Sequence, residues 1–176
     1  MEKKPSKAFE IALSAISCAV ATIFLSLGSL NPLLLATAYI IGCFALMLPL
    51  SKGFILGDVL AYIASGLLAC IFCGFAFAWR LLPFFVFFGL HPLVNYLQSR
   101  YGWNKIVCFI VKAVWFDAAM YLCWRFVFEM NVAVDWINEY IIPVIIVGGT
   151  LFFAVYDYMI FQCQKSVNAV VRRIGR

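Results

Sequence analysis

Residues 33–50 read LLLATAYIIGCFALMLPL, a stretch without a charged side chain. A helix rises about 1.5 Å per residue, so a stretch of this length covers most of the roughly 30 Å hydrocarbon core of a bilayer. Asn31-Pro32 precedes it and Ser51-Lys52-Gly53 follows it, and both are turn-forming combinations. The stretch therefore predicts one helix that spans a membrane.

Similar apolar runs lie on both sides of this stretch, separated by short polar or turn-forming segments. The predicted spans are 8–28, 33–50, 54–78, 81–98, 105–128 and 138–162, with Trp79-Arg80 dividing the third from the fourth. The connections are too short to form a separate extramembrane domain. We therefore predict an all-α fold: a single domain over residues 1–176, built as a bundle of six transmembrane helices, with a short N-terminal segment 1–7 and a basic tail 165–176.

The composition supports lipid as the solvent, because 66% of the residues are hydrophobic and only 12% are charged. A water-soluble fold of 176 residues could not bury so much apolar surface. The seven cysteines lie inside apolar runs, and only Cys70 and Cys73 have metal-like spacing. We expect no metal site and no cofactor. The net charge of +5 forms no basic stripe typical of nucleic-acid binding, so no nucleic-acid partner is expected.

Basic residues gather at alternate ends of the predicted spans, which indicates the orientation of the chain. Basic residues are retained on the cytoplasmic side of a membrane. We therefore expect a multi-pass protein of the cell membrane with both termini in the cytoplasm, where 10 of the 13 basic residues then lie: Lys3, Lys4, Lys7, Lys52, Arg100, Lys105, Lys165, Arg172, Arg173 and Arg176. The first run is too long for a signal peptide and is expected to be retained. The tail alternates apolar and basic residues and is expected to continue as a helix on anionic lipid.

Ionisable side chains within the predicted spans are costly in lipid unless they face a partner or a water-filled cavity. Asp58, Lys112 and Asp157 lie at comparable depth, so Lys112 is expected to pair with one of the two carboxylates. This pair is either a structural lock between helices or a polar hinge that responds to a partner. His91 is expected at the depth of Asp117, as an interhelical hydrogen bond or, alternatively, as part of a proton relay.

The fifth predicted span presents a candidate solute-binding face. Asp117, Tyr121, Trp124 and Arg125 follow one another at i, i+4, i+7 and i+8, so they share one side of a helix. The face offers an anion, a cation and two flat rings to a small, partly aromatic or charged solute. Trp79 and Asn31, in outer turns, are expected to close over it. The alternative is an interfacial aromatic belt with a snorkelling arginine.

Small residues at helical spacing form two strips. On the first span, Ala8, Ala12, Ala15 and Ala19 form a flat surface that another helix can approach closely. The approaching helix belongs either to this chain or to a separate membrane subunit. A second strip, on the third span, is expected to pack inside the protein: Gly57, Ala61, Ser65, Ala69 and Cys73.

Sequence motifs for hydrolases, metalloproteases and nucleotide-binding enzymes are not found, and we expect that the chain is not an enzyme. Because it lacks a nucleotide-binding motif, uphill transport would require an ATP-hydrolysing partner or an ion gradient.

The layout resembles the substrate-binding S component of energy-coupling factor transporters, which import vitamins and micronutrients into bacteria. The resemblance covers most of the chain and includes the Ala-x-x-x-Ala pattern at AFEIA (8–12) and AISCA (15–19). The segment LPLSKGFILG (48–57) is similar to that family's turn, rich in proline and glycine, between its second and third helices. No vitamin-specific signature is present.

By this resemblance, the protein captures a small solute from outside and works with a transmembrane coupling subunit and cytoplasmic ATPases. The alanine strip of the first span would pack on the coupling subunit. Two other function classes remain open. Small membrane scaffolds such as the MreD-like cell-shape proteins have similar length and bind no solute, and an intramembrane enzyme is a third possibility. A cavity at the fifth span that opens outward would distinguish a transporter from a scaffold.

Overall fold

The computed structural model describes residues 6–126 and 140–174, except for the side chains of residues 124–126, 141, 172 and 174. Every regular element in these ranges is helical. The elements are α1 (Lys7–Leu30), α2 (Pro32–Leu50), α3 (Ile55–Cys73), α4 (Phe75–Ala78), η1 (Trp79–Leu81), η2 (Phe84–Phe88), α5 (His91–Tyr101), α6 (Lys105–Phe126), α8 (Ile141–Val144), η3 (Ile145–Gly149) and α9 (Thr150–Ile174).

Long apolar helices make this chain a multi-pass membrane protein. Within the described ranges, five helices are long and apolar enough to cross a membrane. A sixth span forms if the bent pair Phe75–Leu81 and Phe84–Tyr101 is counted as one. The predicted all-α bundle is therefore confirmed.

The turn between the third and fourth spans lies at Gly74. From the sequence, it was predicted at Trp79-Arg80. Gly74 has φ +78°, a backbone conformation that favours glycine, and α3 ends directly before it. Arg80 lies within the helical η1, and its Nη1 donates to the backbone oxygen of Ser29 at 2.8 Å. The predicted boundary was wrong because a polar pair was taken for a break, whereas the left-handed glycine makes the turn.

The first three helices form a close unit. The buried face of α1 includes Ser17, whose hydroxyl donates to the backbone oxygen of Ala45 on α2 at 2.7 Å. The small-residue strip of α3 is entirely buried, as expected. At Gly57 an added Cβ would lie 2.3 Å from Ser14 Oγ, so a larger residue there would have to displace the Ser14 hydroxyl between α1 and α3.

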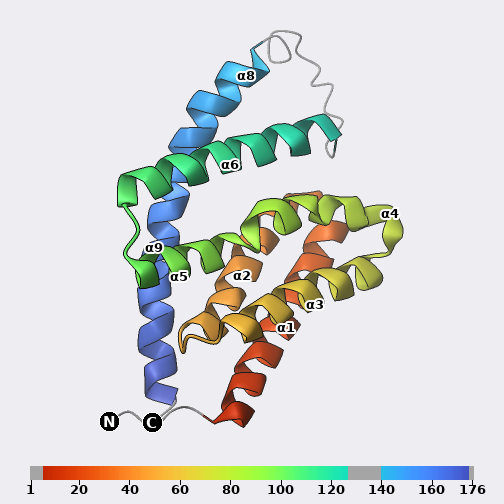
Figure 1. Cartoon of the computed structure of the whole chain (residues 1–176). Helices are drawn as coiled ribbons and strands as arrows, with labels where there is room; N and C mark the ends of the chain where they lie inside the picture. The colour runs from red at the N-terminus through yellow and green to blue at the C-terminus, as the bar shows by residue number, and fades with distance from the viewer. Residues whose placement is uncertain (1–5, 127–139, 175–176) are drawn as a thin grey trace.

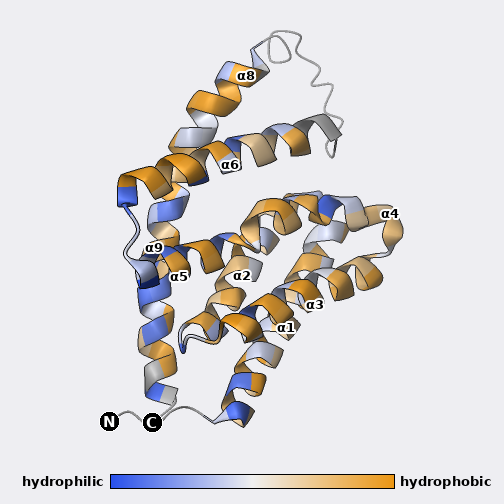
Figure 2. Ribbon diagram, in the orientation of Figure 1, coloured by the Kyte–Doolittle hydropathy of each residue, from blue (hydrophilic) through white to orange (hydrophobic). Residues whose placement is uncertain are grey.

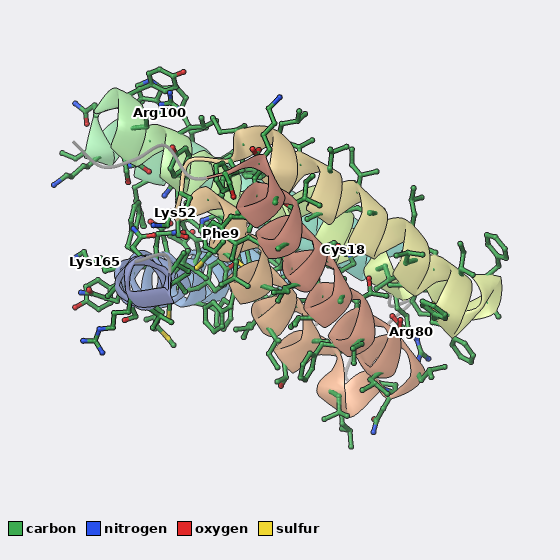
Figure 3. All side chains as sticks on the ribbon, turned by 90° about the horizontal axis from the view of Figure 1, so that it is seen from below. Phe9, Cys18, Lys52, Arg80, Arg100 and Lys165 are labelled. Carbon is green, nitrogen blue, oxygen red and sulfur yellow. The ribbon has the colours of Figure 1, made fainter. Side chains whose placement is uncertain are left out.

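Polar ends of the helices gather on one part of the molecule. Figure 1 shows α1 beginning and α9 ending at the bottom of the view, with the α2–α3 turn and the α5–α6 connection on its left side. Figure 2 shows hydrophilic residues at these ends and hydrophobic residues along most helix surfaces. From below, Lys52, Arg100 and Lys165 lie together, away from Arg80 (Figure 3). The tail continues α9 as a helix to Ile174, as expected.

Candidate functional site

A buried ionic cluster joins α5, α6 and α9. One carboxylate oxygen, Asp157 Oδ1, lies 2.7 Å from Lys112 Nζ and 3.0 Å from His91 Nε2. Asn95 bridges the pair, because its Nδ2 donates to the same oxygen at 3.3 Å and its Oδ1 accepts from Lys112 Nζ at 2.8 Å. None of the four residues is more than 6% exposed. The cluster is therefore a buried Lys112–Asp157 charge pair with the polar side chains of Asn95 and His91 beside it, in keeping with the need of buried charges for partners.

The cluster confirms the expected pairing of Lys112 with Asp157 but corrects the expected partner of His91. His91 lies beside Asp157 and not beside Asp117. The fourth span begins at Phe75 and not at residue 81. Because a helix rises about 1.5 Å per residue, His91 lies about 9 Å further from the start of its span than the sequence suggested. That shift brings His91 level with Lys112 and Asp157.

Asp58 does not join the cluster. It is buried on α3, and its Oδ1 has no hydrogen-bond partner among the described residues. No ion pair in the described part of the chain includes it. The alternative expectation that Asp58 would pair with Lys112 was therefore wrong.

A cavity of about 550 Å³ lies near the cluster, on the side away from the basic helix ends. It lies between α2, η2, α6 and the η3–α9 segment, about one helical turn from the ionic groups. Both π-helical segments border it, and such segments are rare and often occur at functional sites. The lining residues are Pro32, Leu35, Ala36, Tyr39, Pro83, Phe88, Phe116, Met120, Val144, Ile145, Gly148, Gly149 and Phe152.

Aromatic rings dominate two walls of this cavity. Tyr39 and Phe88 stack with ring centroids 5.2 Å apart, and Phe116 and Phe152 stack at 5.9 Å. The Tyr39 hydroxyl is already engaged, because it donates to the backbone oxygen of Arg80. None of the described residues that line the cavity has a charged side chain. Its chemistry is therefore that of an apolar, ring-lined site.

The predicted solute-binding face on α6 is offset from this cavity. Phe116 and Met120 line the cavity. Asp117 and Tyr121, each the next residue along the helix, do not line it. Asp117 Oδ2 accepts a hydrogen bond from Thr150 Oγ1 at 2.9 Å, and Asp117 Oδ1 packs against Gly149. Tyr121 is 41% exposed. The side chains of the other two predicted ligands on this face, Trp124 and Arg125, lie outside the described residues.

Trp79 and Asn31 also lie outside the cavity lining. The Trp79 ring is 45% exposed and packs under the Arg80 guanidinium, 5.3 Å from ring centroid to Cζ. Asn31 caps α2, because its Oδ1 accepts from the Leu33 amide at 3.1 Å. The lining was not identified from the sequence, and it includes the consecutive glycines at 148–149 and Phe88, the last residue of the aromatic run at 84–88.

The alanine strip of α1 lies on the surface. Ala8, Ala12, Ala15 and Ala19 are all exposed, while the opposite side of α1 faces α2 and α3. Figure 3 shows no other helix covering α1. The alternative in which this strip packs on helices of the same chain was therefore wrong for the part of the chain that the structure describes.

Comparisons of the chain with protein-family models, with curated protein sequences and with solved structures found no match.

Proposed function

We propose that this chain is the solute-binding membrane subunit of an importer that works with a separate ATP-hydrolysing module. The cavity between α2, η2, α6 and η3 is the observation on which the proposal rests. Solute sites in helical membrane proteins are concave, largely pre-formed and lined by a few helices, and this cavity has those properties. The resemblance to the S components of energy-coupling factor transporters points to the same function.

The distribution of charge supports an inward direction of transport. Lys52, Lys105 and Lys165 lie at the helix ends away from the cavity, and the positive-inside rule places these ends in the cytoplasm of a cell-membrane protein. In this orientation, the cavity lies in the outer half of the bundle. A solute would therefore enter from outside.

The exposed alanine strip supports a partner within the membrane. Small side chains allow two helix backbones to approach closely, and none of this chain's described helices covers the strip. A transmembrane coupling subunit would pack there and link the chain to cytoplasmic ATPases. An MreD-like scaffold could use the same strip, but a scaffold has no need for a cavity that holds a solute.

Blocking the cavity tests this function. Gly148 lines it, and a Cβ added at Gly148 meets no atom within 4 Å. Gly148→Trp should therefore fill the cavity with little strain on the fold. We expect that wild-type protein purified in detergent retains a small molecule detectable by mass spectrometry and that Gly148→Trp loses at least about 90% of it, because a filled cavity offers no contact surface.

The matched control is Val147→Trp, which adds the same side chain at the neighbouring position. Val147 is 71% exposed and does not line the cavity, so this variant should retain the molecule. Thermal unfolding in detergent checks that both variants are folded. Equal retention by folded Gly148→Trp and wild type, or no retained molecule in the wild type from cells that grow on imported nutrients, would favour the scaffold.

A further inference from the structure

We infer that the solute is a neutral, flat, apolar ring compound and not a charged one. This inference rests on the proposed function and specifies the class of molecule that the cavity takes. It departs from the sequence-based expectation of a site that contains Asp117 and Arg125.

Among the described residues, no side chain that lines the cavity carries a charge. The Tyr39 hydroxyl is bonded to the Arg80 backbone, and Asp117 Oδ1 lies behind Gly149, where an added Cβ would come within 2.6 Å of it. A charged solute would lose its hydration and gain no ion pair from the described lining side chains, of which only the Tyr39 hydroxyl oxygen could still accept a hydrogen bond. Burying a charge without an ion-pair partner costs several kcal/mol or more. A neutral solute avoids this cost.

Aromatic rings separate the ionic cluster from the cavity. Phe87 contacts Phe116 with centroids 5.0 Å apart and His91 at the same distance, and Phe153 packs on Phe116 at 5.6 Å. Phe87 and Phe153 are buried and do not line the cavity, so they lie between it and the charges. Lys112 and Asp157 are therefore not available to a molecule in the cavity.

The shape of the walls favours a flat ring. Tyr39 and Phe88 stack with an interplanar angle of 20°, and Phe116 and Phe152 stack at 24°, so each of these walls contains two nearly parallel, stacked rings. Gly148 and Gly149 leave a third wall without side chains. Aromatic surfaces of this kind attract other rings through offset or edge contacts. The volume of about 550 Å³ lies within the roughly 300–1,000 Å³ of sites for drug-sized ligands.

Photolabelling with two matched probes tests the charge of the solute. Benzophenone is neutral, and 4-benzoylbenzoate is the same aromatic ketone with one carboxylate. We expect saturable benzophenone labelling of peptides that contain Met120 or Val144 in the purified full-length protein. Labelling by 4-benzoylbenzoate should be at least about tenfold weaker, because the unpaired carboxylate would have to be desolvated. Equal labelling of these peptides by the anion would overturn the inference.

Competition tests the shape of the solute. Phenanthrene, a flat ring compound, should protect Met120 and Val144 from benzophenone, and n-dodecane, a stand-in for a lipid acyl chain, should protect them much less. Equal protection by dodecane would mean that the cavity holds acyl chains and would overturn the inference. Folded Gly148→Trp should lose the labelling, whereas Val147→Trp should keep it; labelling that persists in Gly148→Trp places the probe elsewhere and also counts against the inference.

The outcomes separate this inference from the function on which it rests. If Gly148→Trp abolishes retention of the natural solute but benzophenone does not label the cavity, the importer function is supported. The inference that the solute is a neutral ring compound is then wrong. If benzophenone labels the cavity but the wild type retains no molecule, the importer is wrong.

Discussion

Two regions of the same helices, about one turn apart, differ in polarity: one is an ionic cluster and the other is an apolar cavity. At the ionic cluster, α5, α6 and α9 place three polar groups within 3.3 Å of a single carboxylate oxygen. Near it, the same α6 and α9 help to form a cavity of about 550 Å³, and its described lining residues carry no charge. The comparison teaches that the same helices combine a tightly paired polar contact with an apolar cavity, so the two regions can be tested separately.

Removing the cation of the cluster should have the largest effect. Lys112→Met leaves the Asp157 carboxylate buried without its ion-pair partner, which should lower the free energy of unfolding by about 3–5 kcal/mol. Replacing both residues, in Lys112→Met/Asp157→Leu, should recover much of this loss because no unpaired charge remains. Unfolding of the purified proteins in detergent, followed by circular dichroism, measures both effects.

The stability of Lys112→Met also distinguishes the two expected roles of the ion pair, a structural lock between helices and a polar hinge. A stable Lys112→Met variant that loses solute uptake would contradict the structural lock and favour the polar hinge that responds to a partner. Asn95→Ala is a milder control, since it removes hydrogen bonds but keeps the ion pair, and it should cost about 1–3 kcal/mol.

Disturbing the exposed strip should affect assembly and leave stability nearly unchanged. Ala15→Trp adds a large side chain to the strip at a position that no described helix of this chain covers. If a membrane subunit packs there, ATPase activity that co-purifies with the tagged chain should fall about tenfold, which corresponds to about 1.4 kcal/mol of lost association. Ala118→Trp, which makes the same change at an exposed position on α6, should leave co-purification intact. Equal losses in the two variants would contradict a specific docking strip.

The sequence predicted the cluster better than the cavity, and the reason is physical. A buried charge in lipid is costly without a partner, so depth alone narrowed the partner of Lys112 to Asp58 or Asp157. The apolar lining follows no such rule, because any span supplies similar side chains. The π-helical turns at η2 and η3 rotate the helix faces next to the cavity, and the hydrophobic pattern gives no sign of them. His91 was placed wrongly because its span begins at Phe75.

The smallest predicted effect concerns Asp117, and it distinguishes a polar site from an apolar one. In the structure this carboxylate accepts a hydrogen bond from Thr150 and lies behind Gly149. Asp117→Asn should therefore lower the free energy of unfolding by no more than about 1 kcal/mol and leave solute retention unchanged. Phe116→Ala, one residue away on the cavity wall, should reduce retention, because it removes one of the two rings of a stacked pair. Mass spectrometry of the retained molecule measures both variants. If Asp117→Asn releases the solute and Phe116→Ala does not, the solute is held by the polar face of α6, and the ring-lined cavity is then not its binding site.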